Sequence, residues 1–266
     1  VATDGVVFKV QNNELYILLV KRGISKTGET KEFRPYMDYW ALPGGFIRGK
    51  ESAEEAVIRE LKEETNLNLK INKSKTSIYQ TGFYSIPDRD TWSFDGNKKG
   101  TWKQTMSIAF AIITQTSHTP IASTDAKEAK YIKVSDVLNK NIEKKVLAFD
   151  HNKILEDALD YMVDQMALRP LAFDFCDERF TIGDVRAVYE SFWKLTHNIE
   201  SIELGNFQNK ILKQVDQKGK RLINPLPNKP ENKRVQDGRG APALLFTRNK
   251  EAEYLSYIML PTQKRI

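Results

Sequence analysis

A glycine loop followed by an acid-rich segment, GFIRGKESAEEAVIRELKEETNL at residues 45–67, most constrains what this 266-residue chain can fold into. Its glutamates Glu60, Glu63 and Glu64 fall at i, i+3 and i+4 spacing, so they share one face of a predicted helix. Two like charges about 5 Å apart repel by roughly 3 kcal/mol at an effective dielectric constant of about 20. This face is therefore unfavourable unless something neutralises it.

The helix is expected to begin at Ser52, because Glu55 three residues later completes a capping box. Ala53 and Ala56 lie on the glutamate face, so nothing bulky stands over the carboxylates. A hard divalent cation that prefers oxygen ligands, Mg²⁺ or Mn²⁺, would offset the repulsion. The alternative is an ordinary solvated acidic helix, which would not explain the small residues or the preceding Pro43-Gly44-Gly45.

This segment resembles the Nudix box, in which glycine, five residues and glutamate precede seven residues and Arg-Glu-apolar-any-Glu-Glu-any-Gly-apolar. Every charged position of that pattern is present between Glu51 and Glu64. Asn66 replaces the second glycine, and Asn tolerates a left-handed backbone, so the helix is expected to end there. The resemblance implies a Nudix α/β/α sandwich and metal-assisted hydrolysis of the phosphoanhydride in a nucleoside diphosphate derivative.

The resemblance also implies roles for the charged residues. Glu60, Glu63 and Glu64 would be catalytic and would hold Mg²⁺ or Mn²⁺, with Glu51 supporting the metal. Arg59 would orient Glu60 through a salt bridge, as part of the catalytic set.

Further candidates lie outside the box. Glu128 is the candidate general base, with a solvated loop carboxylate as the alternative. Gly44 and Gly45 would let a ligand approach the backbone closely. Arg89 could bind diphosphate or ribose oxygens, or its turn could be held by local ion pairs. Phe83 or Tyr84 could stack on adenine, although apolar strand residues are more often part of the core.

The first half of the chain reads mainly as strands. Apolar β-rich runs predict strands at 6–10, 15–20, 39–42, 77–84, 106–113 and 131–134. Helical spacing at 147–166 is expected to close the domain, and His151 is interpreted as a structural residue near the start of that helix. Residues 91–103 are predicted to be a surface loop.

The second half has a different pattern. Helices are predicted at 182–195, capped by Thr181, and at 207–215. A basic turn at 218–221, a proline-rich stretch and a strand at 243–248 complete the pattern of a winged helix. The expected class is α+β, with a Nudix domain at 1–168 and a winged helix-turn-helix domain at 169–266.

Several short segments of the chain resemble the Nudix-related transcriptional regulators of NAD metabolism (NrtR-type). They lie at 87–90, 147–151, 180–181 and 206–207. The resemblance implies an ADP-ribose-binding Nudix domain, a winged helix that binds operator DNA, and a homodimer. Two functions stay open: an ADP-ribose-type hydrolase, or an ADP-ribose-sensing repressor of NAD-related genes with little or no catalysis.

The second predicted helix and the basic turn supply the DNA-binding candidates. These are Gln208, Asn209, Lys210, Lys213, Lys220 and Arg221. Glu200 and Glu203 just before that helix count against DNA binding, and a basic accessory domain used for dimer contacts is the alternative.

Charge and composition bound the remaining possibilities. Residues 205–266 carry a net charge of +8, whereas residues 150–204 carry −7, which favours a polyanionic partner for the last part of the chain. Cys176 is the sole cysteine, so no intramolecular disulfide can form and a cytoplasmic setting is expected. No apolar run approaches the roughly 20 residues of a membrane span.

Overall fold

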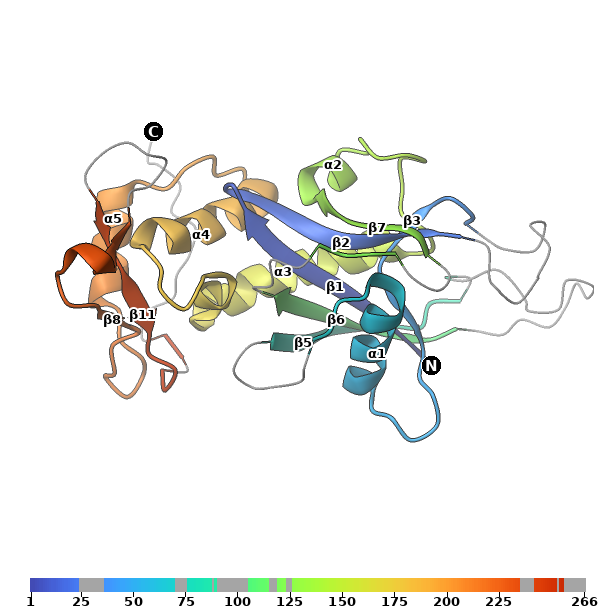
Figure 1. The fold of residues 1–266 in the computed structure, drawn as a ribbon. Helices are drawn as coiled ribbons and strands as arrows, with labels where there is room; N and C mark the ends of the chain where they lie inside the picture. The colour runs from blue at the N-terminus through green and yellow to red at the C-terminus, as the bar shows by residue number, and fades with distance from the viewer. Residues whose placement is uncertain are drawn as a thin grey trace, which may run out of the picture. The chain divides into compact units, whose positions relative to one another are not determined.

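The computed structural model describes residues 1–23, 36–69, 76–87, 89, 105–114, 119–122, 126–234, 242–252 and 254–255 (Figure 1). The predicted loop at 91–103 lies outside these residues. The chain divides into two compact units, Val1–Lys9 with Tyr16–Leu159, and Val10–Leu15 with Asp160–Ile266.

In the described part of the chain, seven strands form the sheet of the first unit. The main path runs β3-β2-β1-β6-β5, while β4 pairs with β1 and β7 pairs with β2. β1 and β6 are parallel, and the other pairs with a described register are antiparallel. The bounds are β1 Ala2–Gln11, β2 Glu14–Arg22, β3 Trp40–Ala41, β4 Gly44–Phe46, β5 Thr76–Tyr84, β6 Ser107–Thr114 and β7 Ala126–Lys133.

β1 and β2 form the predicted hairpin, with Asn12 and Asn13 at its tip in the left-handed region (φ 52° and 59°). The two strands separate towards their other ends, and the segment 40–46 fills the gap. Its β3 part pairs with β2, and its β4 part pairs with β1. We call residues 40–46 the wedge segment, and it leads directly to the acidic helix.

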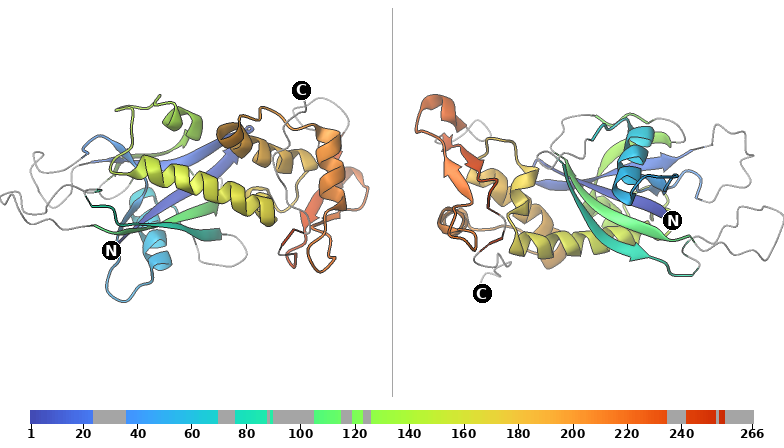
Figure 2. Two further views of the ribbon diagram at one scale, coloured as in Figure 1. Left: turned by 180° about the vertical axis from the view of Figure 1, so that it is seen from behind. Right: turned by 90° about the horizontal axis from the view of Figure 1, so that it is seen from below.

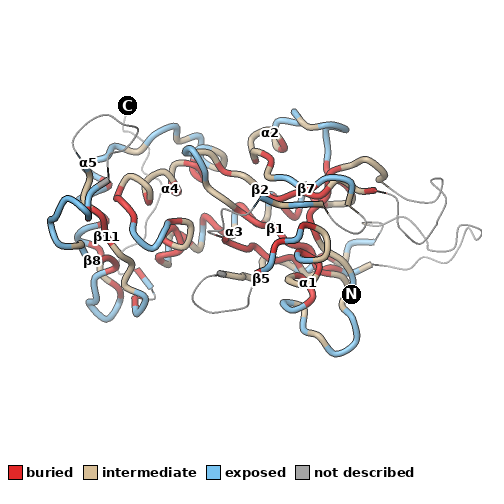
Figure 3. Tube along the Cα trace, viewed as in Figure 1, coloured by how far each residue is buried: buried red, intermediate tan, exposed pale blue. Residues whose placement is uncertain are grey.

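Helices cover both faces of this sheet (Figures 1 and 2). α1 (Ala53–Thr65) packs Val57 and Leu61 against Val7 and Leu18 of the sheet. The start of α3 (His151–Leu168) lies on the opposite face, and a short helix, α2 (Val134–Leu138), follows β7. The buried residues gather on the strands and on the inner sides of the helices (Figure 3).

The ends of α1 are as the sequence predicts. The Ser52 hydroxyl accepts a hydrogen bond from the Glu55 amide, and the Glu55 carboxylate accepts one from the Ser52 amide. Asn66 ends the helix in the left-handed conformation, at φ 55°. Replacement of the glycine by Asn therefore leaves the helix terminus intact.

The second unit is built on α4 (Ile182–His197) and α5 (Leu204–Lys213). Around them lie short elements: the 3₁₀ helices η2 Leu171–Phe175 and η3 Pro230–Asn232, and the strands β8 Ile223–Pro225, β9 Lys233–Arg234, β10 Ala243–Leu244 and β11 Phe246–Arg248. β8 pairs with β11, and β9 pairs with β10. Phe180 exchanges backbone hydrogen bonds with Phe246 and so adds to the β11 edge.

The mixed helices and strands confirm the α+β class. Several predicted boundaries were wrong. β1 begins at Ala2 instead of 6, β7 begins at Ala126 instead of 131, and α3 begins at His151 instead of 147. α5 begins at Leu204 instead of 207, because the Glu203 carboxylate caps the helix by accepting from the Gly205 and Asn206 amides. Within the residues that the structure describes, no helix is long and apolar enough to cross a membrane.

Candidate functional site

The wedge segment and α1 meet through two glycines. The Gly44 amide donates to Glu64 Oε2 at 3.1 Å. A Cβ atom at Gly44 would lie 2.1 Å from the Thr3 carbonyl oxygen, and one at Gly45 would lie 2.5 Å from Glu60 Oε1. Packing against the Thr3 backbone therefore requires glycine at position 44, whereas a side chain at position 45 would meet the end of the Glu60 side chain.

Arg59 connects the carboxylates of this region. Its guanidinium donates to both oxygens of Glu51 at 2.9 and 2.6 Å, to Glu60 at 2.6 Å and to Glu63 at 3.3 Å. It also donates to the carbonyl oxygen of Phe46, at 3.0 Å. The hydrogen bonds from Arg59 lower the pKa of Glu51 to about 2, while those to Glu51 raise the pKa of Arg59. The predicted ion pair between Arg59 and Glu60 is thus present.

A second arginine of this site, Arg48, was not predicted from the sequence. It forms a two-point ion pair with Glu63, at 2.8 and 2.9 Å, and its amide donates to Glu51 at 2.7 Å. Its position within residues 45–67, three residues after Gly45, could have indicated that it lies close to the glutamates. Because its side chain is largely exposed, Arg48 can move away from Glu63 at little cost.

Glu64 has a different environment. The residue as a whole is half-buried on α1, but its carboxyl group is enclosed between α1 and the wedge segment. Burial raises the pKa of Glu64 to about 8, and Glu60 and Asp4 raise it further, against the lowering effects of the Gly44 amide and Arg22. Without a bound cation, this carboxyl group is mostly protonated at neutral pH.

The donor set suits a hard divalent cation, although arginines now neutralise part of it. No group of three His, Cys, Asp or Glu side chains among the described residues is arranged to hold a metal. However, Glu60 and Glu64 carry enclosed carboxyl groups, the charge of Glu60 disfavours ionisation of Glu64, and Glu51 and Glu63 lie within reach of the same arginine. All are oxygen ligands, which Mg²⁺ and Mn²⁺ prefer.

A buried polar chain supports the other side of the wedge segment. The Leu42 amide donates to His151 Nδ1 at 2.9 Å, and His151 Nε2 lies 3.5 Å from Asp4 Oδ1. The Ser107 hydroxyl donates to Asp4 Oδ2 at 2.6 Å. Burial alone would raise the pKa of Asp4, but His151, Ser107 and Arg89 together hold it below its usual value. His151 is the first residue of α3, so its interpretation as a structural residue is supported.

Arg89 belongs to this chain of contacts, which argues against its predicted ligand-binding role. Its side chain is 6% exposed, donates twice to Asp150 at 2.7 and 2.8 Å, and lies 3.5 Å from Asp4. The alternative reading, a segment held by ion pairs, fits the structure, but the partners come from β1 and the start of α3. Such distant pairing could not be inferred from the local sequence.

Glu128 is placed away from α1, which corrects its prediction as a general base. It lies inside β7, where it pairs with Lys21 of β2 and forms an ion pair with Lys130 at 2.8 Å. Side chains alternate along a strand, and Tyr131 of β7 packs against the α1 core. Glu128 therefore points to the opposite face. The prediction failed because β7 begins earlier than expected.

Phe83 and Tyr84 take opposite sides of β5. Phe83 is 54% exposed and pairs with Ile108, which packs against the α1 core, so it lies on the α1 face. Tyr84 is buried and donates its hydroxyl to Asp157 of α3. Phe83 therefore offers an exposed aromatic ring on the α1 face of the sheet.

The DNA-binding candidates on α5 are divided between two faces. Asn209 and Lys213 are exposed and Lys210 is half-buried, all on one side of the helix. Gln208, which is also exposed, instead lines a cavity on another side of the helix. In the basic turn, Lys220 forms an ion pair with Glu251 at 2.6 Å, and Arg221 lines the same cavity as Gln208.

Comparison with known proteins identifies the first part of the chain. A family model described as NUDIX domain matches residues 1–157. An ADP-ribose pyrophosphatase of Methanocaldococcus jannaschii is 39% identical over 157 residues, 59% of this chain and 71% of the relative. An ADPR responsive transcriptional repressor, NtrR of Acinetobacter baylyi, is 24% identical over 200 residues, 74% of this chain and 67% of the relative.

Solved structures resemble nearly the whole chain. A MutT/nudix family protein from Enterococcus faecalis has a TM-score of 0.66 at 24% identity, covering 93% of this chain and 85% of that chain. Shewanella oneidensis NrtR, complexed with a 27mer DNA, has a TM-score of 0.62 at 20% identity, covering 98% and 99%. At these identities the similarity shows the fold alone.

Proposed function

Since this chain belongs to the NUDIX domain family, we propose that it hydrolyses the phosphoanhydride of ADP-ribose or a related nucleoside diphosphate derivative. The observation that carries this proposal is the enclosed Glu64 carboxyl against Gly44, beside carboxylates that Arg59 holds in place. The 39% identity to an ADP-ribose pyrophosphatase supports the choice of substrate class.

Each group of the site has a role in this proposal. Glu51, Glu60, Glu63 and Glu64 would hold Mg²⁺ or Mn²⁺, which when bound neutralises the diphosphate and lowers the pKa of the attacking water. Arg59 fixes the direction of the Glu60 carboxylate through its ion pair. Arg59 contacts Glu51, Glu60 and Glu63, and the Gly44 amide contacts Glu64, which brings these four carboxyl groups to one region.

The substrate is oriented by the groups around the acidic helix. Gly44 and Gly45 carry no side chains, and their backbone lies beside Glu60 and Glu64, where the diphosphate would bind. The exposed ring of Phe83 offers a surface for the adenine base. Arg89 and Glu128 are left out, because one is enclosed by ion pairs and the other faces away from α1.

The test is turnover of ADP-ribose with Mg²⁺, measured as AMP and ribose 5-phosphate. We expect Glu64→Gln to lower kcat on the order of 10²- to 10⁴-fold, the range for loss of a catalytic carboxylate. Glu54→Gln, at an exposed position in the first turn of α1, is the matched control and should keep full activity. Unchanged turnover in Glu64→Gln would contradict the proposal.

We also propose that the second unit is a winged helix that binds operator DNA, which would make the protein a regulator as well. The supporting observations are the outward polar face of α5 and the similarity to a solved DNA complex over 98% of this chain. Glu203 does not oppose this reading, because its carboxylate is occupied in capping α5. Asn209, Lys210, Lys213 and Lys220 are the proposed DNA contacts, and a homodimer would match a twofold-symmetric operator.

Binding to a palindromic operator, followed at several salt concentrations, tests the regulator. Lys213→Ala should weaken binding to all sequences and reduce the slope of log K against log salt by about 1. Lys50→Ala, an exposed lysine of the first unit, should leave binding unchanged. Equal affinity for the operator and for random DNA would contradict a specific regulator without affecting the hydrolase proposal.

A further inference from the structure

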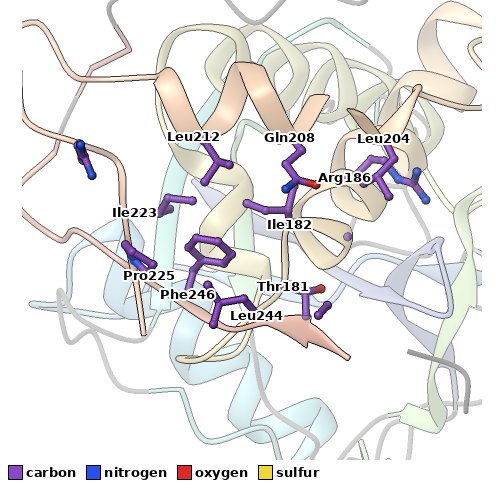
Figure 4. A pocket seen from close by; sticks show the side chains of 13 residues that line it. Thr181, Ile182, Arg186, Leu204, Gln208, Leu212, Ile223, Pro225, Leu244 and Phe246 are labelled. Carbon is purple, nitrogen blue, oxygen red and sulfur yellow. The ribbon is translucent and has the colours of Figure 1, made fainter. Parts of the chain in front are cut away.

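The second unit contains a cavity of about 510 Å³ between α5, the start of α4 and the strands β8 and β11 (Figure 4). In this view, Leu212 and Gln208 extend from α5 towards Ile182 of α4 and Ile223 of β8. Phe246 of β11 lies below them, and Leu244 and Thr181 line the lower side. The volume falls within the roughly 300–1,000 Å³ of small-molecule sites.

Two leucines of α5 give this cavity an unusual wall. Leu204 and Leu212 are 44% and 39% exposed, yet both face the cavity, together with Gln208 between them. Their i, i+4, i+8 spacing forms a stripe separate from Phe207 and Ile211, which are buried in the core of the unit. α5 therefore carries apolar surface beyond what its own packing uses.

The charged groups that line the cavity favour an anion. Arg186 and Arg221 line it, and none of the described lining residues is acidic. The Arg186 side chain is 28% exposed and its printed contacts are long: Nε lies 3.5 Å from Glu190, and Nη1 donates to the Ile202 carbonyl oxygen at 3.5 Å. An anionic acceptor in the cavity could therefore form a shorter charge-assisted hydrogen bond with this guanidinium.

We propose that this cavity binds a small amphipathic anion, with an apolar body against Leu204, Leu212 and Phe246 and a carboxylate, sulfonate or phosphate group at Arg186 or Arg221. A mostly apolar lining with a few cationic groups recognises that chemistry. The site is distinct from the acidic helix, since every lining residue belongs to the second unit.

The position of the cavity has a consequence that rests on the proposed DNA-binding function. One side of α5 lines the cavity, while Asn209 and Lys213 lie on the other. A compound in the cavity would therefore contact the helix that we propose reads DNA. Ligand binding itself is tested without DNA, so the two proposals can fail separately.

The first experiment titrates the full-length protein with 8-anilinonaphthalene-1-sulfonate, an aromatic anion whose fluorescence rises in apolar sites. We expect one saturable site per chain. At least one of Arg221→Gln and Arg186→Gln should weaken binding about tenfold, which corresponds to loss of one charge-assisted hydrogen bond. Leu212→Asp, which places an acid at a partly exposed position in the wall, should abolish binding.

Arg179→Gln is the matched control, because it makes the same charge change at an exposed arginine outside the cavity. Decanoate should displace the probe at concentrations about tenfold lower than decan-1-ol, which has the same chain but no charge. Absence of saturable binding, or binding that Leu212→Asp or both arginine variants leave unchanged, would overturn the proposal. Thermal melting of each variant shows that the fold is retained.

Discussion

At the scale of single residues, the site depends on a carboxyl group whose pKa is shifted far from normal. Burial raises the pKa of Glu64 to about 8, whereas an unfolded chain would ionise it near 4.5. The folded protein thus holds a proton that the unfolded protein releases over this pH window. The contribution of the Glu64 carboxyl group to the free energy of unfolding is fully present below about pH 4.5, and it is lost as the pH rises through about 8.

Glu64→Gln should therefore stabilise the metal-free protein at alkaline pH. In EDTA at pH 8.5, we expect its free energy of unfolding to exceed that of the wild type by about 1–2 kcal/mol. This is less than the full shift of 1.36 kcal/mol per pKa unit would give, because the residue is partly exposed. At pH 4 the two proteins should be equally stable. Urea denaturation at both pH values measures the difference, and a gain that is the same at both would contradict the assignment.

Gly44 and Gly45 should respond differently to the same substitution. A Cβ at Gly44 would strike the Thr3 backbone, so Gly44→Ala should lower the free energy of unfolding by about 2 kcal/mol or more. A Cβ at Gly45 would meet the Glu60 side chain, which can rotate, so Gly45→Ala should mainly lower turnover. Urea denaturation and kcat, measured on both variants, separate the two effects. The reverse pattern would show that the wedge segment packs differently.

At the scale of secondary-structure elements, the wedge segment is held from two sides. Its Leu42 amide donates to His151 and its Gly44 amide donates to Glu64, so neither relies on strand pairing. The acceptors come from α3 and α1, on opposite faces of the sheet. Loss of either acceptor would leave a buried amide without a partner, at a cost of about 1–3 kcal/mol.

His151→Asn and His151→Leu test this support. Asn places an oxygen close to the position of Nδ1 and can still accept from Leu42, whereas Leu cannot. We expect His151→Leu to be about 1–3 kcal/mol less stable than His151→Asn, and to show faster hydrogen exchange at the Leu42 amide. Equal stability and equal exchange in the two variants would show that the imidazole is not the acceptor that matters.

Many features of the helices and strands could be predicted from the sequence, because they depend on residues that are close together in the chain. The Asn12-Asn13 hairpin, the Ser52 capping box and the left-handed Asn66 depend on residues within a few positions of each other. The separation of β1 from β2 and the insertion of residues 40–46 depend on pairing between distant segments. No local pattern records such pairing.

The same limit explains the errors in the site. The Arg59 ion pairs lie within one helix and the loop before it, and the prediction of its contact with Glu60 held. Arg89 and Asp4 find each other only through the tertiary fold. Glu128 was expected in a loop before β7, but the strand already begins at Ala126. Alternation along the strand therefore turns its side chain to the face opposite α1.

At the scale of the whole molecule, the chain combines two compact units, and the proposed functions assign one ligand to each. If ADP-ribose weakens operator binding by some factor, thermodynamic linkage requires the operator to weaken ADP-ribose binding by the same factor. Glu64→Gln is suited to this measurement, because it should bind without consuming the ligand.

We expect ADP-ribose to change the operator affinity of Glu64→Gln about 5- to 150-fold, the usual range of coupling between sites. Calorimetric titration of ADP-ribose, with and without operator, should return the same factor. Two unequal factors would show that a further state or ligand is involved. A factor of one would mean that the two units act independently.

The packing of Gly44 restricts how a protein of this design can change over evolutionary time. Any side chain at that position would collide with the Thr3 carbonyl oxygen. Substitutions of Gly44 should therefore be selected against, whatever the substrate. An exposed rim position such as Phe83 carries no such restriction. New substrate preferences should therefore arise from substitutions at exposed positions such as Phe83, while Gly44 stays the same in relatives with different substrates.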